Sequence, residues 1–230
     1  MTAASAASLP RAVARLGFGS AIASAVLAFG WFVTMIIQTI VAPPQAWTGI
    51  EAFARTFQPV QLLNFVPSLP LASTFLVMMV CVYFYAAEPK RIWALLGVAF
   101  TTVYAVMASS NYAIQLLVVR ASLAAGETEG LGLLSHANSH SVFWALATSY
   151  GYMSLAMLCA AWVFGADRIG RWIRWLFVAV GVTAPLQFVG VLFELGVAAG
   201  ALPGLVWSLA TPAACLLLAV VFRRADAVRA

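Results

Sequence analysis

Charged side chains are scarce in this sequence. Asp, Glu, Lys and Arg together make up 8% of its 230 residues, whereas 64% of the residues are apolar. A soluble domain carries roughly 25% charged residues, because its surface must be hydrated. So few charges cannot cover a water-exposed surface of this size, which excludes a soluble globular fold. We therefore expect lipid to cover most of the outer surface, with the bilayer as the main partner.

Residues that supply familiar catalytic and cofactor chemistry are also few. The single lysine, Lys90, falls in a predicted turn, which excludes a retinal-binding lysine inside the membrane. The three cysteines lie in apolar stretches without metal-ligand spacing, and we interpret them as core residues. The sequence contains no Walker motif, no GxGxxG after a strand, no CxxC pair and no basic stripe interleaved with aromatic residues. We expect no cofactor and no nucleic-acid partner.

Long apolar runs are abundant instead. A helix needs about 20 apolar residues to cross the hydrocarbon core of a bilayer. The runs of this kind cover residues 17–42, 66–87, 92–119, 141–165, 172–198 and 204–222. They are apolar throughout rather than in alternation, so helices are favoured over the strands of a barrel. The first run exceeds the roughly 7–15 apolar residues of a signal peptide, so we expect it to be retained. We predict an all-α, polytopic membrane protein in which residues 1–230 form a single domain of six transmembrane helices.

Basic residues concentrate at one end of these predicted spans. Of the 12 basic residues, all except two lie there: Arg11, Arg15, Lys90, Arg91, Arg168, Arg171, Arg174, Arg223, Arg224 and Arg229. The two at the opposite end are Arg55 and Arg120. Because positive residues favour the cytoplasmic side of a membrane, we predict a multi-pass protein of the cell membrane with both termini in the cytoplasm.

Two connections at the opposite end differ from the short turns. The segment 46–58 places its apolar residues on one helical face and is followed by Pro59. This pattern predicts a short helix lying in the membrane interface after the first span. The segment 121–139 is long, contains glycine and carries Glu127 and Glu129. Two interpretations of it stay open: a lid over a site, or a solvated loop.

Polar side chains gather near the same end. Counted at about 1.5 Å per residue from the inner end of each span, Asn111 and Gln187 fall inside a hydrocarbon core about 30 Å thick. Polar groups at such depths are unfavourable and tend to mark function. The candidate ligand-binding residues near this level are Asn64, Asn111, Gln115, His140, Gln187 and Glu194. If their faces point inward, they form a polar pocket that opens outward beneath the 121–139 segment. Pro185 and Pro212 predict kinks in the fifth and sixth spans.

We expect a non-enzymatic helical bundle that holds a small or lipid-like ligand, or a membrane partner, in this pocket. A second hypothesis is an intramembrane enzyme that uses His140 and Glu194 as an acid–base pair on a lipid substrate. A third is a small transporter, although no pair of broken spans at matching positions supports it. His136 and His140 have the spacing of a metal-binding pair, but no motif glutamate accompanies them, so we expect no metal. The oligomeric state stays open, a homo-oligomer included.

The stretch NYAIQLLVVRASLAAGETEGLGLLSHANSHSVFWAL and the GRWIRWLF turn after it resemble a group of uncharacterised bacterial membrane proteins of the domain-of-unknown-function type. The resemblance covers about residues 105–180. An Asn-Tyr…Gln element and an Asn-x-His element recur in that group. The matching positions in this chain are Asn111, Tyr112, Gln115, Asn138 and His140. The resemblance therefore adds Tyr112 to the candidate ligand-binding residues and implies a bacterial inner membrane.

The chain also departs from that group. Where the group has acidic residues in the following helix, this sequence has Ala147, Thr148 and Ser149. Any role of those acidic residues is therefore absent here. The group has no established activity, so the resemblance supports a polar cluster without indicating its purpose.

Overall fold

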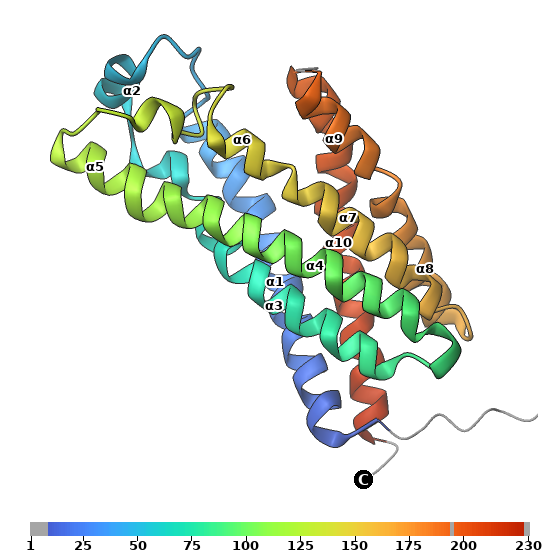
Figure 1. The fold of residues 1–230 in the computed structure, drawn as a ribbon. Helices are drawn as coiled ribbons and strands as arrows, with labels where there is room; N and C mark the ends of the chain where they lie inside the picture. The colour runs from blue at the N-terminus through green and yellow to red at the C-terminus, as the bar shows by residue number, and fades with distance from the viewer. Residues whose placement is uncertain (1–8, 194–195, 228–230) are drawn as a thin grey trace, which may run out of the picture.

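The computed structural model describes residues 9–193 and 196–227. Its α-helices are α1 (Arg11–Val41), α2 (Ile50–Thr56), α3 (Phe65–Tyr85), α4 (Arg91–Ala113), α5 (Arg120–Ala125), α6 (Val142–Ala147), α7 (Ser149–Ala160), α8 (Arg168–Gly181), α9 (Ala184–Leu192) and α10 (Gly196–Ala227). No strand occurs within the described residues. The prediction of an all-α protein is confirmed (Figure 1).

Six helical stretches are long and apolar enough to cross a membrane. They cover Arg11–Val41, Pro59–Tyr85, Glu88–Ala125, Val142–Val163, Arg168–Gly190 and Pro203–Ala227. Each corresponds to one of the predicted spans, so the prediction of six spanning helices is also confirmed. The first, second, third and sixth stretches are longer than the predicted apolar runs, because residues at their ends, many of them polar or charged, continue the helices beyond the hydrocarbon length.

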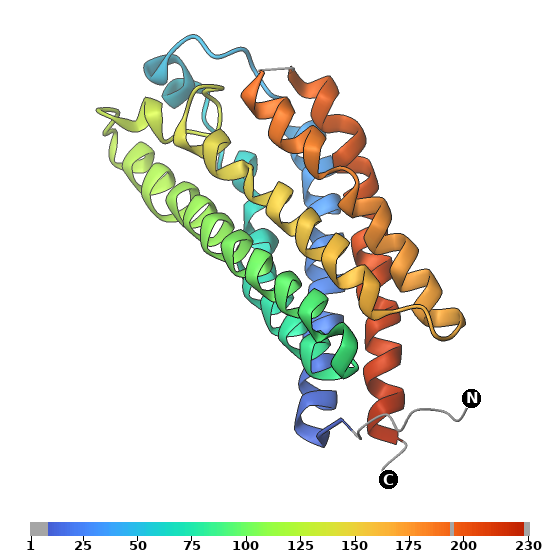
Figure 2. The same ribbon diagram turned by 45° about the vertical axis from the view of Figure 1, so that its right-hand side comes forward.

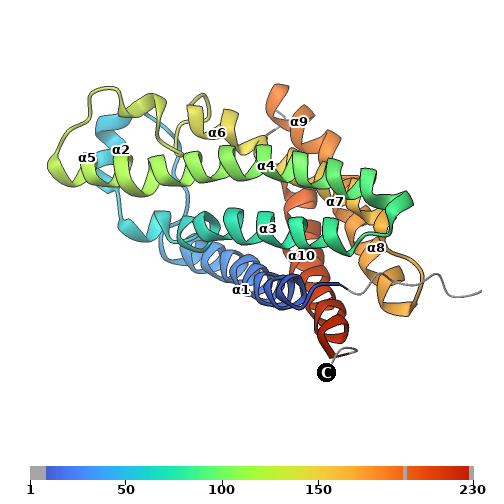
Figure 3. The same cartoon turned by 60° about the horizontal axis from the view of Figure 1, so that its bottom comes forward.

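The spans pack in chain order around a closed ring. α1 packs against α3, α3 against α4, α4 against α7, and α7 against α8. α10 packs against both α8 and α1, which closes the ring (Figures 2 and 3). The short connections 86–90 and 161–167 make α3–α4 and α7–α8 antiparallel neighbours.

The start of α1 and the end of α10 lie together at one end of the bundle (Figure 1). Arg11 and Arg15 each form an ion pair with Asp226, at N–O distances of 3.4 and 3.5 Å. α2 and the connection between α5 and α6 lie at the other end, which we call the distal end (Figure 1).

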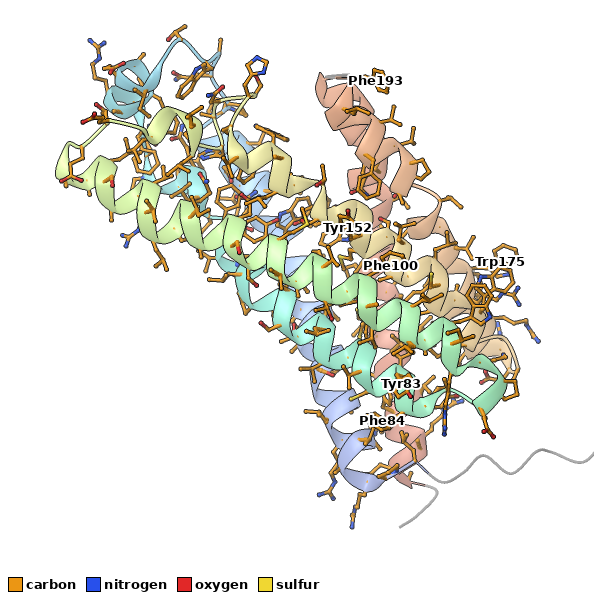
Figure 4. The ribbon with its side chains drawn as sticks, viewed as in Figure 1. Tyr83, Phe84, Phe100, Tyr152, Trp175 and Phe193 are labelled. Atoms are coloured by element: carbon orange, nitrogen blue, oxygen red, sulfur yellow. The ribbon has the colours of Figure 1, made fainter. Side chains whose placement is uncertain are left out.

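Large side chains fill the inside of the ring. Tyr104, Phe75, Met153 and Phe177 are fully buried. Phe100 of α4 and Tyr152 of α7 face each other with ring centroids 6.5 Å apart (Figure 4). In lipid there is little hydrophobic drive between helices, so close packing of this kind must supply the association.

The outward faces of the spans are apolar. Trp175 of α8 points away from the bundle (Figure 4), and Val26, Val106 and Leu209 are likewise exposed on α1, α4 and α10. A surface of this composition is compatible with acyl chains and not with water.

The prolines affect the two spans differently. α8 ends at Gly181 and α9 begins at Ala184, so the fifth span is broken and Pro185 lies in the first turn of α9. A proline there removes no helical hydrogen bond, because the first N–H groups of a helix have no partner in it. Pro212 lies inside α10, which continues without a break.

Gly181 tests the packing of the ring. A Cβ atom added there would lie 2.5 Å from Cβ and 2.9 Å from Cα of Leu158 in α7. Because a backbone atom is involved, Gly181→Ala must push α8 away from α7, and we expect it to lower the free energy of unfolding by about 1–3 kcal/mol. Gly19→Ala is the matched control, since a Cβ at Gly19 meets nothing within 4 Å. Thermal unfolding in detergent measures both; equal stability of the two variants would contradict the packing described.

Candidate ligand-binding site

A cavity of about 400 Å³ lies at the distal end, and we call it the distal pocket. Its walls come from the last turn of α1, the 42–49 connection, α2, the start of α3 and the segment 136–144. The lining residues are Gln38, Ala42, Pro44, Gln45, Ala46, Trp47, Thr48, Gly49, Ala52, Phe53, Thr56, Gln61, Asn64, Phe65, His136, Ala137, Phe143 and Trp144. Segments from both halves of the chain therefore form the pocket.

The predicted interfacial helix is part of this wall, but it is shorter than the segment 46–58. α2 begins only at Ile50, because Gly49 has a φ of +126° that breaks the helical path before it. It ends at Thr56, and Pro59 begins a separate 3₁₀ turn, Pro59–Leu62. The residues just before Gly49 are therefore not helical, and residues 44–48 line the pocket in this irregular conformation.

Aromatic rings form a continuous wall on one side of the distal pocket. We call it the aromatic wall; its members are Trp47, Phe53, Phe65, His136, Phe143 and Trp144. Neighbouring ring centroids along it lie between 5.3 and 6.0 Å apart. Most of these contacts are edge-to-face or tilted, the arrangements that aromatic rings prefer.

Gln115 fixes the position of this wall. It is fully buried in a π-helical segment, Ile114–Val119, that joins α4 to α5. Its Nε2 donates to the carbonyl of Leu134 at 2.7 Å, and its Oε1 accepts from the backbone N–H of His136 at 3.1 Å. A single side-chain amide thus hydrogen-bonds two backbone groups of the 126–141 segment, which has no continuous series of backbone hydrogen bonds of its own. A π-turn interrupts helical register and frequently occurs where a side chain is redirected toward a site.

Further hydrogen bonds hold the same segment. Nδ2 of Asn111 donates to the carbonyl of Phe143 at 3.1 Å, and Nε1 of Trp144 donates to the carbonyl of His136 at 3.1 Å. Nδ2 of Asn138 donates to the carbonyl of Gly132 at 2.7 Å. These bonds anchor the part of the 121–139 segment that lines the pocket, His136 and Ala137, and they fix the adjoining end of the aromatic wall at Phe143 and Trp144.

His136 is the ionisable member of the wall. Its Nδ1 lies 3.3 Å from Oε1 of Gln115, so Nδ1 carries the proton and Nε2 remains an acceptor in this arrangement. Burial among aromatic rings lowers the pKa of His136 to about 4. The imidazole is therefore neutral at physiological pH.

Two amide oxygens of the distal pocket have no partner among the described residues. They are Oε1 of Gln38 at the end of α1 and Oδ1 of Asn64 just before α3. Both atoms are buried, and an unpaired buried acceptor is unfavourable. No Asp, Glu, Lys or Arg is among the lining residues within the described chain. The pocket is thus lined by aromatic surface and by neutral amide and hydroxyl side chains without a formal charge, and the two unpaired oxygens lie buried within its wall.

The sequence-predicted residues separate into groups. Asn64 lines the pocket, and Asn111 and Gln115 lie behind it as supports. The ring of Tyr112 stacks on Phe65 at 5.4 Å, and its hydroxyl hydrogen-bonds to that of Tyr150. These four predicted residues therefore lie close to one another around the aromatic wall.

The remaining predicted residues lie elsewhere. The side chain of His140 is exposed and outside the pocket lining, and its backbone N–H donates to Oδ1 of Asn138. Nε2 of Gln187 donates to the hydroxyls of Ser154 and Thr183 at 3.1 and 3.3 Å, between α7 and α9. Glu194 lies outside the described residues.

The phenylalanines of the wall are functional candidates that the sequence did not indicate, and His136 was considered there only as one half of a metal-binding pair. Phe65 and Phe143 open two spans at the distal level, as interfacial aromatic residues often do, and nothing in their spacing shows that they meet. No group of three or more His, Cys, Asp or Glu residues that could hold a metal occurs within the described part of the chain.

No protein-family model, curated protein or solved structure matches the chain. The function must therefore be inferred from the chemistry of the distal pocket.

Replacing Gln115 tests its role in holding the wall. Gln115→Leu keeps the volume but leaves the Leu134 carbonyl and the His136 N–H unpaired, which costs about 1–3 kcal/mol locally. We expect backbone amide exchange of residues 131–141 to accelerate at least tenfold. Gln187→Leu is the control, because its partners lie on α7 and α9 and exchange of the same residues should be unchanged. Unaltered exchange in the Gln115 variant would show that the segment is held by other contacts.

His136 makes stability depend on pH in a defined direction. Its pKa is about 4 in the folded protein and about 6.5 when unfolded. Between these values the unfolded chain binds the extra proton, so stability falls as pH is lowered from about 6.5 to about 4, by an amount on the order of 3 kcal/mol. His136→Phe removes this dependence while keeping a ring in the wall. The difference in unfolding temperature between the two proteins should therefore change over that pH range and be constant above it.

Proposed function

We propose that this protein is a multi-pass cell-membrane protein that binds a small or lipid-like ligand in its distal pocket without chemically changing it. One observation carries the proposal: a cavity at the distal end is lined by aromatic rings and by neutral amide and hydroxyl side chains, with no Asp, Glu, Lys or Arg among its described lining residues. A volume of about 400 Å³ falls within the roughly 300–1,000 Å³ of small-molecule sites.

The membrane orientation belongs to this proposal. Of the basic residues that the structure describes, nine lie toward the end of the bundle where α1 begins and α10 ends, which we place in the cytoplasm. The distal pocket then opens toward the outer leaflet. Trp47 and Trp144 line the pocket and are partly exposed, and tryptophan is enriched at membrane–water interfaces.

The surroundings of the pocket favour an amphipathic ligand. Ile37, Ile40 and Val41 of α1 are exposed beside Gln38, with 41%, 75% and 58% of their surface accessible. A ligand whose polar head occupies the pocket can therefore lay an apolar chain along this face of α1.

Binding is better supported than catalysis. His136 is the one ionisable side chain among the described lining residues, and its ring is held by Gln115 within the aromatic wall. General acid–base chemistry or covalent catalysis requires a second group in reach, such as a nucleophile or a carboxylate.

Filling the pocket tests the proposal. Ala52→Trp places a large ring inside the cavity, whereas Ala54→Trp adds the same ring on α2 outside the lining. We expect native mass spectrometry of the wild-type protein, released from gentle detergent, to show retained small-molecule adducts that Ala52→Trp loses and Ala54→Trp keeps. Equal adducts in all three proteins, or none in the wild type, would refute ligand binding in this pocket.

A further inference from the structure

The chemistry of the distal pocket selects among ligands by charge. Its aromatic wall presents ring π-systems, whose faces carry partial negative charge and attract cations. An anionic group placed against these faces would be repelled, and no Lys or Arg lines the described pocket to offset the repulsion.

The neutral state of His136 maintains this preference. A protonated imidazole in the wall would repel a cation, but burial keeps the pKa of His136 at about 4, well below physiological pH. Gln115 accepts from its Nδ1, which leaves Nε2 with a lone pair rather than a second proton.

The charges on the surface around the pocket also favour a cation over an anion. Glu51, Glu127 and Glu129 are exposed on the distal connections, against Arg55 and Arg120. The other nine basic residues within residues 9–193 and 196–227 lie toward the opposite end. A cation that approaches the distal end therefore avoids the positive end of the molecule.

The absence of a lining carboxylate narrows the class of cation. A primary ammonium or a metal ion is strongly hydrated and requires charged or numerous oxygen ligands when it loses water. A methylated ammonium carries its charge beneath apolar groups, is weakly hydrated, and is the cation that aromatic side chains bind best without a carboxylate.

We propose that the distal pocket binds an alkylated ammonium group, of the choline type. This inference rests on the proposed function and specifies its ligand class. The group can arrive as a free solute or as the headgroup of a zwitterionic phospholipid, because the recognised chemistry is the same. A cavity of about 400 Å³ accommodates a headgroup, and the exposed α1 face beside Gln38 is where the acyl chains of a lipid would lie.

Choline and 3,3-dimethylbutan-1-ol form a matched pair of probes, since they share a shape and differ in charge. Calorimetric titration of the full-length protein in dodecyl maltoside, which contains no ammonium, should show choline binding at least ten times more tightly. Equal affinity would refute the ammonium assignment and leave ligand binding in the pocket intact. If choline does not bind, and Ala52→Trp still abolishes the small-molecule adducts seen by mass spectrometry, the ammonium assignment is also refuted while ligand binding in the pocket stands.

Phe53→Leu separates the aromatic contribution from apolar contact. Leucine keeps an apolar side chain but has no π-system, so we expect choline affinity to fall at least fivefold and the affinity for the neutral alcohol to change less than twofold. Phe100→Leu is the control, because Phe100 packs on Tyr152 outside the pocket (Figure 4). A fall of the same size for both probes in Phe53→Leu would overturn the cation–π assignment.

Nanodiscs distinguish the two sources of the ammonium group. If a lipid headgroup occupies the pocket, choline binding in phosphatidylcholine nanodiscs should be at least tenfold weaker than in phosphatidylglycerol nanodiscs, after subtraction of empty discs. If the ligand is a free solute, the two affinities should agree. Either result supports the ammonium class and names its source, whereas no saturable choline binding in either disc refutes it.

Discussion

A buried amide that is fully hydrogen-bonded is the interaction on which the distal architecture depends. Within lipid each backbone N–H and C=O must find a partner inside the protein, and helices provide those partners only for their own residues. The 126–141 segment departs from helical geometry at the edge of this environment. Gln115 supplies a donor to Leu134 and an acceptor to His136, and so allows an irregular segment to pack down on the bundle. The aromatic wall is a consequence of that packing.

The ring of spans obeys a different constraint, that of close approach. The ring of Phe222 packs against Gly17, and the ring of Phe188 packs against Gly151. A Cβ atom added at either glycine would lie too close to the ring atoms. Large rings on one helix therefore pack against glycines on the neighbouring helix. This pairing of small residues with rings brings α1 close to α10 and α7 close to α9, in addition to the Asp226 ion pairs and the Gln187–Ser154 hydrogen bond.

The sequence was sufficient for the spans, because length and apolar composition decide what can cross a bilayer. It was less informative about the site. Depth placed Asn64, Asn111 and Gln115 at one level, but depth does not encode the direction of a side chain. The π-turn at Gln115 rotates that direction, and a periodicity of 3.6 residues cannot anticipate it. The meeting of Phe53, Phe65 and Phe143 depends on how two irregular connections fold over each other, for which no periodic signal exists.

The closed ring has a consequence for how the chain can be connected. Since α1 begins where α10 ends, beside the ion pairs of Asp226, a short linker could join these two points on one side of the membrane. The chain could then be opened at the 86–90 turn, which lies on the same side, without reversing the direction of any helix. Such a circular permutant would keep every pair of neighbouring helices in the ring. The final arrangement of the helices therefore does not depend on the order in which they are synthesised.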